Sequence, residues 1–203
     1  MELYLIRHGE CFSPANEYYD RDKKTMNPPL TEKGTRQARQ LAERCKTIGF
    51  DKVFSSDLTR AVQTAENILK VAPCDYFACP AFREIDMGEI HAKSWSAFPE
   101  LHAQWLLHNE DIPYPSGENG EDVWKRCRVE LEEIIKNRYQ KVAIVMHGGT
   151  IRAMICGLLD LPQQRRFYFG YPPENCSITI VKYREEEERF YLHSFNDVSH
   201  LSD

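Results

Sequence analysis

A short apolar run that ends in a histidine and a glycine occurs twice in this chain of 203 residues. Residues 3–6 lead into Arg7-His8-Gly9, and residues 141–146 lead into His147-Gly148-Gly149. Short apolar runs bounded by glycine are typical of buried strands. Open α/β sheets bind their ligands at the carboxyl ends of their strands. If the two runs are neighbouring parallel strands, both histidines lie at one such edge, within a few residues' width of each other.

The residues after the first run suit the recognition of an anion. Arg7 offers a planar fork of donors that matches phosphate or carboxylate. His8 can act as a base, a nucleophile or a ligand near neutral pH. Gly9 lets the backbone turn sharply and approach a ligand closely. The stretch therefore indicates an anion site with a reactive imidazole.

Helical and strand-like patterns alternate along the first third of the chain. Thr31 is the expected N-cap of a helix whose apolar face includes residues 38–45. Residues 52–55 form the next expected strand, and Ser56 or Asp57 is the expected cap of the helix after it. This βαβα beginning predicts an α/β fold of three layers, in which helices flank a mostly parallel central sheet.

Two charged positions outside the histidine stretches carry further hints. Arg60 falls in the first turn of the second helix, where the helix dipole disfavours a cation unless an anion is bound there. Glu84, Asp86 and Glu89 form an acidic cluster in an expected loop. For any single carboxylate of such a cluster, solvation in a surface loop is the simplest interpretation.

The length suits a single domain over residues 1–203, with a helical segment around residues 94–120 that we expect to cap the site. The tryptophans Trp95, Trp105 and Trp124 are expected to be core residues rather than parts of a cofactor site. We find no glycine-rich phosphate loop, no spacing typical of metal ligands and no internal repeat in the sequence.

The net charge and the cysteine content limit the classes of partner and the compartment that we expect for this protein. The formal net charge of -5 argues against nucleic acid or an anionic membrane as the main partner. The sequence shows neither a signal peptide nor a membrane anchor. Its seven cysteines include no C-x-x-C pair and are expected to be reduced, buried thiols, which predicts a cytoplasmic protein.

Four stretches together resemble the signatures of the histidine phosphatase superfamily. Arg7-His8-Gly9-Glu10 resembles its first motif, and residues 56–65 match Ser-x-Leu-x-Arg-Ala-x-x-Thr-Ala residue for residue. Residues 82–88 resemble Leu-x-Glu-x-x-x-Gly, and His147-Gly148 resembles the His-Gly motif. The chain looks closest to the compact α-ribazole and broad-specificity phosphatases of that group.

The resemblance implies a phosphoglycerate mutase-like fold and a metal-independent, acid-type phosphoric monoester hydrolase. Such an enzyme would act on a small phosphorylated metabolite through a phosphohistidine, with His8 as nucleophile and Glu84 as proton donor. Phosphoryl transfer needs fixed cations, an in-line nucleophile and an acid. The expected catalytic residues are His8, Glu84, His147, Arg7 and Arg60. The expected substrate contacts are Arg7, Arg60, His147, Gly148 and Cys11. No metal and no cofactor is expected.

The chain departs from the superfamily pattern at a few positions. Cys11 stands where the superfamily often has Thr, and it is either an inert small residue or a reactive thiol. Pro14 stands where an Asn often helps to hold phosphate, and Asn16 could replace that Asn only through a shifted loop. Ala92 and Lys93 stand where a Gly is common, which affects the expected shape of this loop.

Other functions remain open at this stage. A cofactor-dependent phosphoglycerate mutase is the first alternative, although the segment after Glu84 is short and poor in arginine for one. A non-catalytic phosphate-binding module is the second, and a metal enzyme that uses both histidines is weaker still. A homodimer through an edge strand is one arrangement that such a sheet allows. Further candidate substrate contacts are Tyr18, Tyr19, Arg21, Lys23, Lys24, His91 and Lys93, with Arg152, Arg165 and Arg166 either contributing or only decorating the surface.

Overall fold

The computed structural model of the chain describes residues 1–13, 15–23, 25–169 and 172–202. The strands are β1 (Glu2–Arg7), β2 (Tyr19–Asp20), β3 (Thr25–Met26), β4 (Lys52–Ser55), β5 (Asp75–Ala78), β6 (Lys141–Met146), β7 (Ile178–Arg184) and β8 (Arg189–Asp197). The α-helices are α1 (Glu32–Cys45), α2 (Thr59–Val71), α3 (Ile90–Lys93), α4 (Pro99–Leu106), α5 (Gly120–Lys136) and α6 (Gly148–Leu158). The 3-10 turns are η1 (Ala15–Tyr18), η2 (Pro80–Phe82), η3 (Trp95–Ala97), η4 (Gln163–Tyr168) and η5 (Glu185–Glu187).

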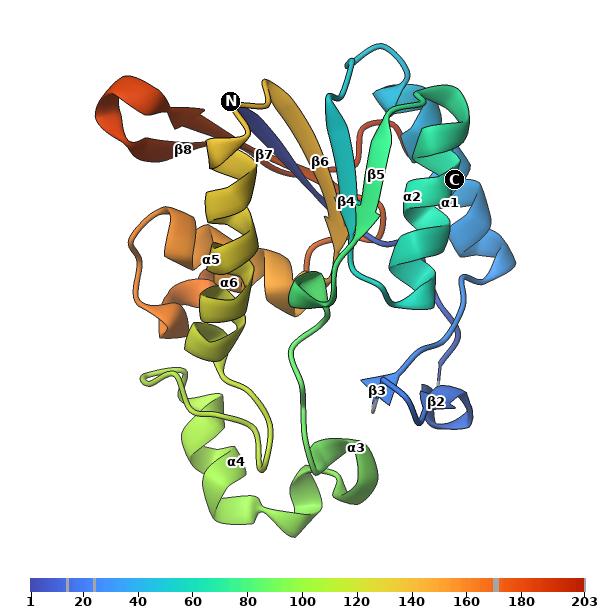
Figure 1. Cartoon of the computed structure of the whole chain (residues 1–203). Helices are drawn as coiled ribbons and strands as arrows, with labels where there is room; N and C mark the ends of the chain where they lie inside the picture. Colours follow the sequence, from blue (N-terminus) through green and yellow to red (C-terminus); the bar gives the residue numbers. More distant parts are fainter. Residues whose placement is uncertain (14, 24, 170–171, 203) are drawn as a thin grey trace.

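The central sheet has the strand order β5-β4-β6-β1-β7-β8 (Figure 1). Strands β5, β4, β6 and β1 run parallel to one another. Strand β7 runs antiparallel to β1, and β8 runs antiparallel to β7. The predicted three-layer α/β fold with a mostly parallel sheet is therefore confirmed. Strands β1 and β6 are direct neighbours, and their register pairs Arg7 with Met146. The two histidines follow these paired residues at the same edge of the sheet.

Side chains of β1 alternate between the two faces of the sheet, as the pleat of a strand requires. Leu3 and Leu5 belong to the core under α5 and α6. Tyr4 and Ile6 belong to the core under α1 and α2. Figure 1 shows these two helix pairs on opposite sides of the sheet. Strand β1 is covered on both faces, which explains why its sequence is an unbroken apolar run.

The two predicted helix starts have different outcomes. Thr31 is the N-cap of α1, and its side chain accepts a hydrogen bond from Gly34 N, as predicted. The cap predicted for α2 is wrong, since neither Ser56 nor Asp57 is its N-cap. The N-cap is Leu58, which offers no side-chain cap, and Ser56 Oγ accepts from Leu58 N just before the helix. The first turn of α2 therefore depends on a cap from elsewhere in the chain.

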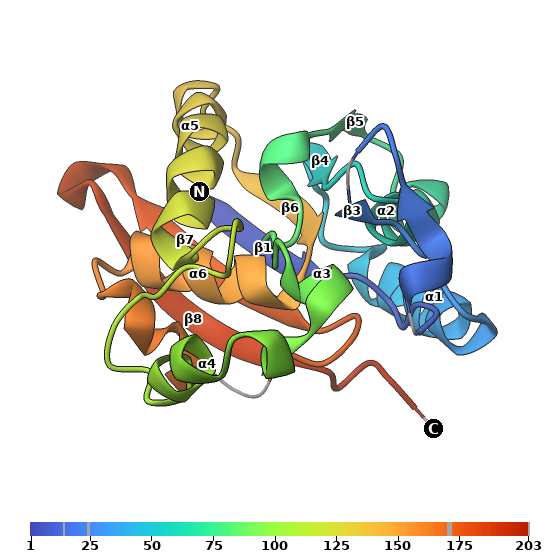
Figure 2. The same cartoon turned by 90° about the horizontal axis from the view of Figure 1, so that it is seen from below.

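The predicted helical segment around residues 94–120 contains η3 and α4 and follows the short helix α3. In Figures 1 and 2 this region lies beyond the same end of the sheet as β2 and β3. Trp95 and Trp105 pack on each other with ring centroids 5.3 Å apart, and both are only half buried. Only Trp124 packs against the main core. The core assignment is therefore wrong for the first two tryptophans, because the segment between α3 and α5 stands away from the sheet.

All seven cysteines are free thiols. Five of them are buried, as predicted, whereas Cys11 and Cys74 are only half buried. Among the described residues, no helix combines the length and the apolar character that a membrane span requires.

Candidate active site

His8 is fixed at the carboxyl end of β1 by its backbone. Its N–H donates to Met146 O at 3.0 Å, and its carbonyl accepts from Asn175 Nδ2 at 2.9 Å and from Cys176 N at 3.3 Å. The side chain is only 5% exposed. The sheet and the segment before β7 therefore hold the imidazole in one place.

The partners of the His8 ring define its tautomer. Nδ1 lies 2.7 Å from Gly9 O, and Nε2 lies 3.1 Å from Arg60 Nε. A carbonyl oxygen can only accept and a guanidinium N–H can only donate, so Nδ1 carries the proton and Nε2 carries the lone pair. Burial first, and then the charges of Arg60 and Arg7, hold the pKa of His8 well below 6.5. The imidazole is therefore neutral, with its lone pair directed toward the arginine.

His147 lies beside His8, with ring centroids 5.0 Å apart. It is the N-cap residue of α6 and is fully buried. Neither ring nitrogen has a hydrogen-bond partner among the residues that the structure describes. Burial first, and then the positive charge of Arg60, hold the pKa of His147 well below 6.5. A buried imidazole without a partner is costly, which indicates that a bound polar group completes this site.

Two arginines flank the pair of histidines. Arg7, the last residue of β1, donates from Nη1 to Pro173 O, while its buried Nε has no partner among the described residues. Arg60 extends from the first turn of α2 and also donates from Nη1 to Met26 O at 3.2 Å. Burial lowers the pKa of Arg60, and the negative charge of Glu84 is among the effects that oppose it. The two guanidinium groups supply fixed positive charge beside the imidazoles.

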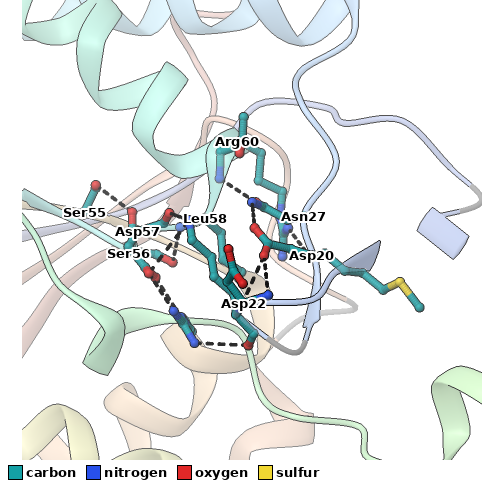
Figure 3. Close-up of polar contacts among 12 residues, drawn as sticks. Asp20, Asp22, Asn27, Ser55, Ser56, Asp57, Leu58 and Arg60 are labelled. Carbon is teal, nitrogen blue, oxygen red and sulfur yellow. Dashed lines mark hydrogen bonds and ion pairs between the residues drawn. The ribbon is translucent and has the colours of Figure 1, made fainter. Parts of the chain in front are cut away.

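The missing cap of α2 comes from the loop that contains β2 and β3, as Figure 3 shows. Asn27 Oδ1 accepts from Thr59 N at 2.6 Å, and Asn27 Nδ2 donates to Asp20 Oδ2 at 3.0 Å. Together with the contact from Arg60 to Met26 O, these bonds fasten the loop to the helix that carries Arg60. The cap was missed because Asn27 lies 32 residues before Thr59, and no local pattern indicates such a contact.

Glu84 lies in an irregular segment between η2 and α3, and its carboxylate meets the N-terminus of α6. Oε2 accepts from Gly149 N at 3.2 Å, and Oε1 accepts from Thr150 N at 3.1 Å and from Ile85 N at 2.9 Å. Thr150 Oγ1 donates to Arg83 O at 2.7 Å and lies 3.3 Å from Glu84 Oε1. Because α6 begins immediately after His147, Glu84 and this histidine are held by the same helix start.

A cavity of about 640 Å³ opens beside Arg7, His8 and Arg60, whereas Glu84 and His147 are not among its lining residues. The residues that line it are Arg7, His8, Cys11, Phe12, Ser13, Met26, Pro28, Arg60, Ile90, His91, Ala92, Lys93 and Ser94. The structure thus brings Arg7, His8, Arg60 and Cys11 to one wall. Gly148 is also close, since a Cβ on it would lie 3.6 Å from Arg7 Nε.

The further candidate contacts divide into two groups. His91 and Lys93 line the cavity, whereas Tyr18, Tyr19 and Arg21 are not among its lining residues. Lys23 instead donates to Asp57 O at 2.5 Å. Pro14, Lys24 and the side chain of Asn16 lie outside the described residues.

The second set of arginines lies near α6 and η4. Arg166 is buried and pairs with Asp111, while Arg165 is exposed on the surface, beside Tyr168. Arg152 is half buried, and the charge of Glu84 acts on its pKa against the larger, lowering effect of burial. Of the three, Arg152 is the one whose charge interacts with the site.

Cys11 is held at the cavity wall by an isolated β-bridge to Leu30. Burial raises the pKa of its thiol, although Arg60 and Arg7 act in the opposite direction. The structure therefore favours the inert thiol over the reactive thiolate. Within the described ranges, no group of three or more His, Cys, Asp or Glu residues is arranged to hold a metal ion.

Comparison with known proteins agrees with this geometry. The model of the histidine phosphatase superfamily (branch 1) matches residues 3–198. The chain therefore belongs to the histidine phosphatase superfamily.

Individual relatives carry two kinds of name. A probable phosphoglycerate mutase GpmB from Enterobacter sp. (strain 638) is 31% identical, with 99% of this chain and 95% of that protein aligned. A mycobacterial glucosyl-3-phosphoglycerate phosphatase, solved with inorganic phosphate, superposes with a TM-score of 0.82 at 26% identity over 99% of both chains. A mutant phosphoserine phosphatase from Entamoeba histolytica, solved with phosphoserine, superposes with a TM-score of 0.79 at 26% identity over 99% of both chains. The similarity extends over the whole fold, and the names include both mutase and phosphatase.

Proposed function

We propose that this protein is a metal-independent phosphomonoester hydrolase that works through a phosphohistidine on a small phosphorylated metabolite. The observation that carries the proposal is the tautomer of His8. Its protonated Nδ1 is tied to Gly9 O, so Nε2 carries the lone pair, which accepts from Arg60 Nε beside the ring of His147. A nucleophile needs such an unprotonated, oriented lone pair at neutral pH.

In the first step the phosphoryl group binds between Arg7 and Arg60, and its oxygens accept the N–H groups of both. The Arg60 donor then leaves Nε2, whose lone pair attacks phosphorus. The Nε2–P bond forms while the bond from phosphorus to the leaving oxygen breaks. Glu84 gives its proton to that oxygen, and His147 donates to an equatorial oxygen.

In the second step Glu84 takes a proton from water as the water attacks the phosphohistidine. The N–P bond breaks, phosphate leaves, and His8 returns to its neutral tautomer. The positive charge that phosphoryl transfer requires comes from the arginines. The segment of α3 and α4 serves as a cap over the leaving group, and it lines the cavity through Ile90 and Ala92 of α3.

The names of the relatives guide the choice of substrates. The glucosyl-3-phosphoglycerate and phosphoserine phosphatases act on phosphorylated acids, so a metabolite panel should begin with these. The second candidate is phosphoglycerate mutase activity, which the name of the GpmB relatives favours. A mutase must keep its phosphohistidine long enough to return the phosphoryl group to an organic acceptor, whereas a phosphatase passes it to water.

The test is phosphate release from an aryl phosphate in excess chelator by the parent, by His8→Ala and by His193→Ala. His193 is an exposed histidine of β8 and serves as the matched control. We expect release by the parent and by His193→Ala only. Equal release by His8→Ala would refute the phosphohistidine, and loss of release in chelator would refute metal independence. Isomerisation of phosphoglycerate without phosphate release would identify the mutase.

A further inference from the structure

The segment that carries Glu84 has no regular structure to hold it. Residues 83–89 lie between η2 and α3. A general acid must lie within hydrogen-bond reach of the leaving oxygen, and small displacements reduce its contribution. The contacts that position this segment must therefore come from elsewhere in the chain.

Thr150 of α6 supplies three of these contacts, and Arg126 of α5 supplies a second set. Its Nη1 donates to Ala81 O, and its Nη2 donates to Glu84 O at 3.2 Å. The same guanidinium forms a two-pronged pair with Glu118, with Nε to Oε1 at 2.8 Å and Nη2 to Oε2 at 3.0 Å. One side chain thus donates hydrogen bonds to the backbone carbonyls of Ala81 and Glu84, on both sides of the buried Phe82.

Glu118 adds hydrogen bonds to the backbone on the C-terminal side of Glu84. Its Oε2 also accepts from Asp86 N at 2.9 Å, and its backbone N–H donates to Asp86 O at 2.9 Å. The pair of Arg126 and Glu118 therefore contacts the chain before, at and after the proposed acid. Both side chains are about three-quarters buried, with exposures of 23% and 24%, so solvent screens the pair less than an exposed one.

The backbone of the Glu84 segment also contacts the backbone of residues 115–118 directly. Glu89 N donates to Pro115 O at 2.9 Å, and Gly88 has a φ of 52°. A Cβ on Gly88 would lie 2.1 Å from Pro115 O, and a Cβ on Gly117 would lie 2.3 Å from Asp86 O. Only glycine permits this approach. The segment of Glu84 is therefore joined to the start of α5 along its length.

We infer that Arg126, through its pair with Glu118, is the positioning residue of the proposed acid Glu84. Arg126 does not line the cavity beside His8, and it lines a second cavity together with Glu84 and Glu118. Its hydrogen bonds reach the proposed acid through Glu84 O, whereas only its charge acts on His147. This inference rests on the proposed function. It concerns the step in which the leaving oxygen takes up a proton, and it leaves the attack by His8 unchanged.

The test compares two esters by kcat/KM, which reports the steps up to phosphoryl transfer. An alkyl phosphate has a basic leaving group that needs a proton. The leaving group of 2,4-dinitrophenyl phosphate is the weakly basic dinitrophenolate, which needs none. We expect Arg126→Met to lower kcat/KM for the alkyl ester at least ~10-fold and for the dinitrophenyl ester less than ~3-fold. Arg126→Lys should recover part of the loss, because it keeps the charge but not the fork.

Arg128→Met is the matched control, since it removes an exposed pair with Glu132 on the same helix. It should leave both esters unchanged. In a Glu84→Gln background, Arg126→Met should cause no further loss for the alkyl ester, because the group that it positions is gone.

Each other outcome counts against a definite claim. If Arg126→Met slows both esters by the same factor in a folded protein, Arg126 has only a structural role and the inference is wrong. If losses in the double variant add in full, Arg126 does not act through Glu84. If the parent hydrolyses neither ester, the proposed function fails and the inference fails with it. If the parent is active and His8→Ala is inactive, the proposed function stands, and the behaviour of Arg126→Met then tests the inference alone.

Discussion

Arg60 Nε donates a hydrogen bond to His8 Nε2 over 3.1 Å. A guanidinium beside this nitrogen keeps the imidazole neutral, because a proton on Nε2 would face a positive charge and a second donor. The contact also joins two parts of the site, since His8 ends β1 and Arg60 begins α2. One pair of residues therefore contains both the proposed nucleophile and one of the charges that we propose to bind phosphate.

The tautomer of His8 can be measured directly. We expect nitrogen NMR of the labelled protein to show His8 with its proton on Nδ1 and no imidazolium as the pH falls through 6.5, because the pKa is held well below that value. Exposed His193 supplies the reference signal in the same spectra. A proton on Nε2 would contradict the hydrogen-bond assignment.

Arg60 should be needed for phosphate binding as well as for catalysis. Replacing it with Met removes one of the two guanidinium groups proposed to bind phosphate, together with the donor to His8. We therefore expect kcat/KM to fall by about two orders of magnitude. Inhibition by inorganic phosphate should weaken in parallel, and the pKa of His8 should rise because a neighbouring cation is gone. An unchanged inhibition constant would show that phosphate does not contact Arg60.

The two buried histidines should make stability depend on pH in a defined direction. Both have pKa values well below 6.5 in the folded state. Below 6.5 the unfolded chain takes up protons that the folded chain does not, so the free energy of unfolding falls as the pH decreases toward the folded pKa values. Each histidine contributes a slope of up to ~1.4 kcal/mol per pH unit.

Urea unfolding between about pH 7 and pH 5 measures this slope. The variant His147→Gln should reduce it by the share of one histidine. A slope that does not change would mean that His147 is protonated in the folded protein.

Thr150 should stabilise the segment of Glu84. Its hydroxyl donates to Arg83 O at 2.7 Å in a fully buried position. In Thr150→Val this carbonyl loses its donor, which we expect to cost ~1–3 kcal/mol in the free energy of unfolding. Thr150→Ser keeps the hydroxyl and should lose much less. A Thr150→Val variant as stable as the parent would contradict the role of this hydroxyl.

Asn27 should act as a cap supplied from a distance. Asn27→Ala removes the acceptor for Thr59 N, and we expect a loss of about 1 kcal/mol in the free energy of unfolding. The KM for a phosphate ester should rise as well, since Arg60 lies one residue further along α2. The control Asn137→Ala removes a comparable side-chain bond, to Glu133 O at the end of α5, and should leave KM unchanged.

Strands β1, β4 and β6 and the catalytic candidates could be predicted because local patterns encode them. The apolar runs before His8 and His147 each specify a buried strand. The first turn of a helix disfavours a free cation, which marked Arg60 as a candidate before its contact with His8 was known. These signals depend on neighbours in sequence, so they can be identified without a structure.

Tertiary structure alone decided which partners complete the site. Asn27 caps α2 from 32 residues away, and Arg126 reaches Glu84 O across 42 residues. Neither residue type at either position carries a local signature, because a hydrogen bond between distant segments depends on how the chain packs. The same holds for the tautomer of His8, which follows from a carbonyl next to it and a guanidinium 52 residues away. The sequence by itself determined which chemistry is available, and packing decided how that chemistry is oriented.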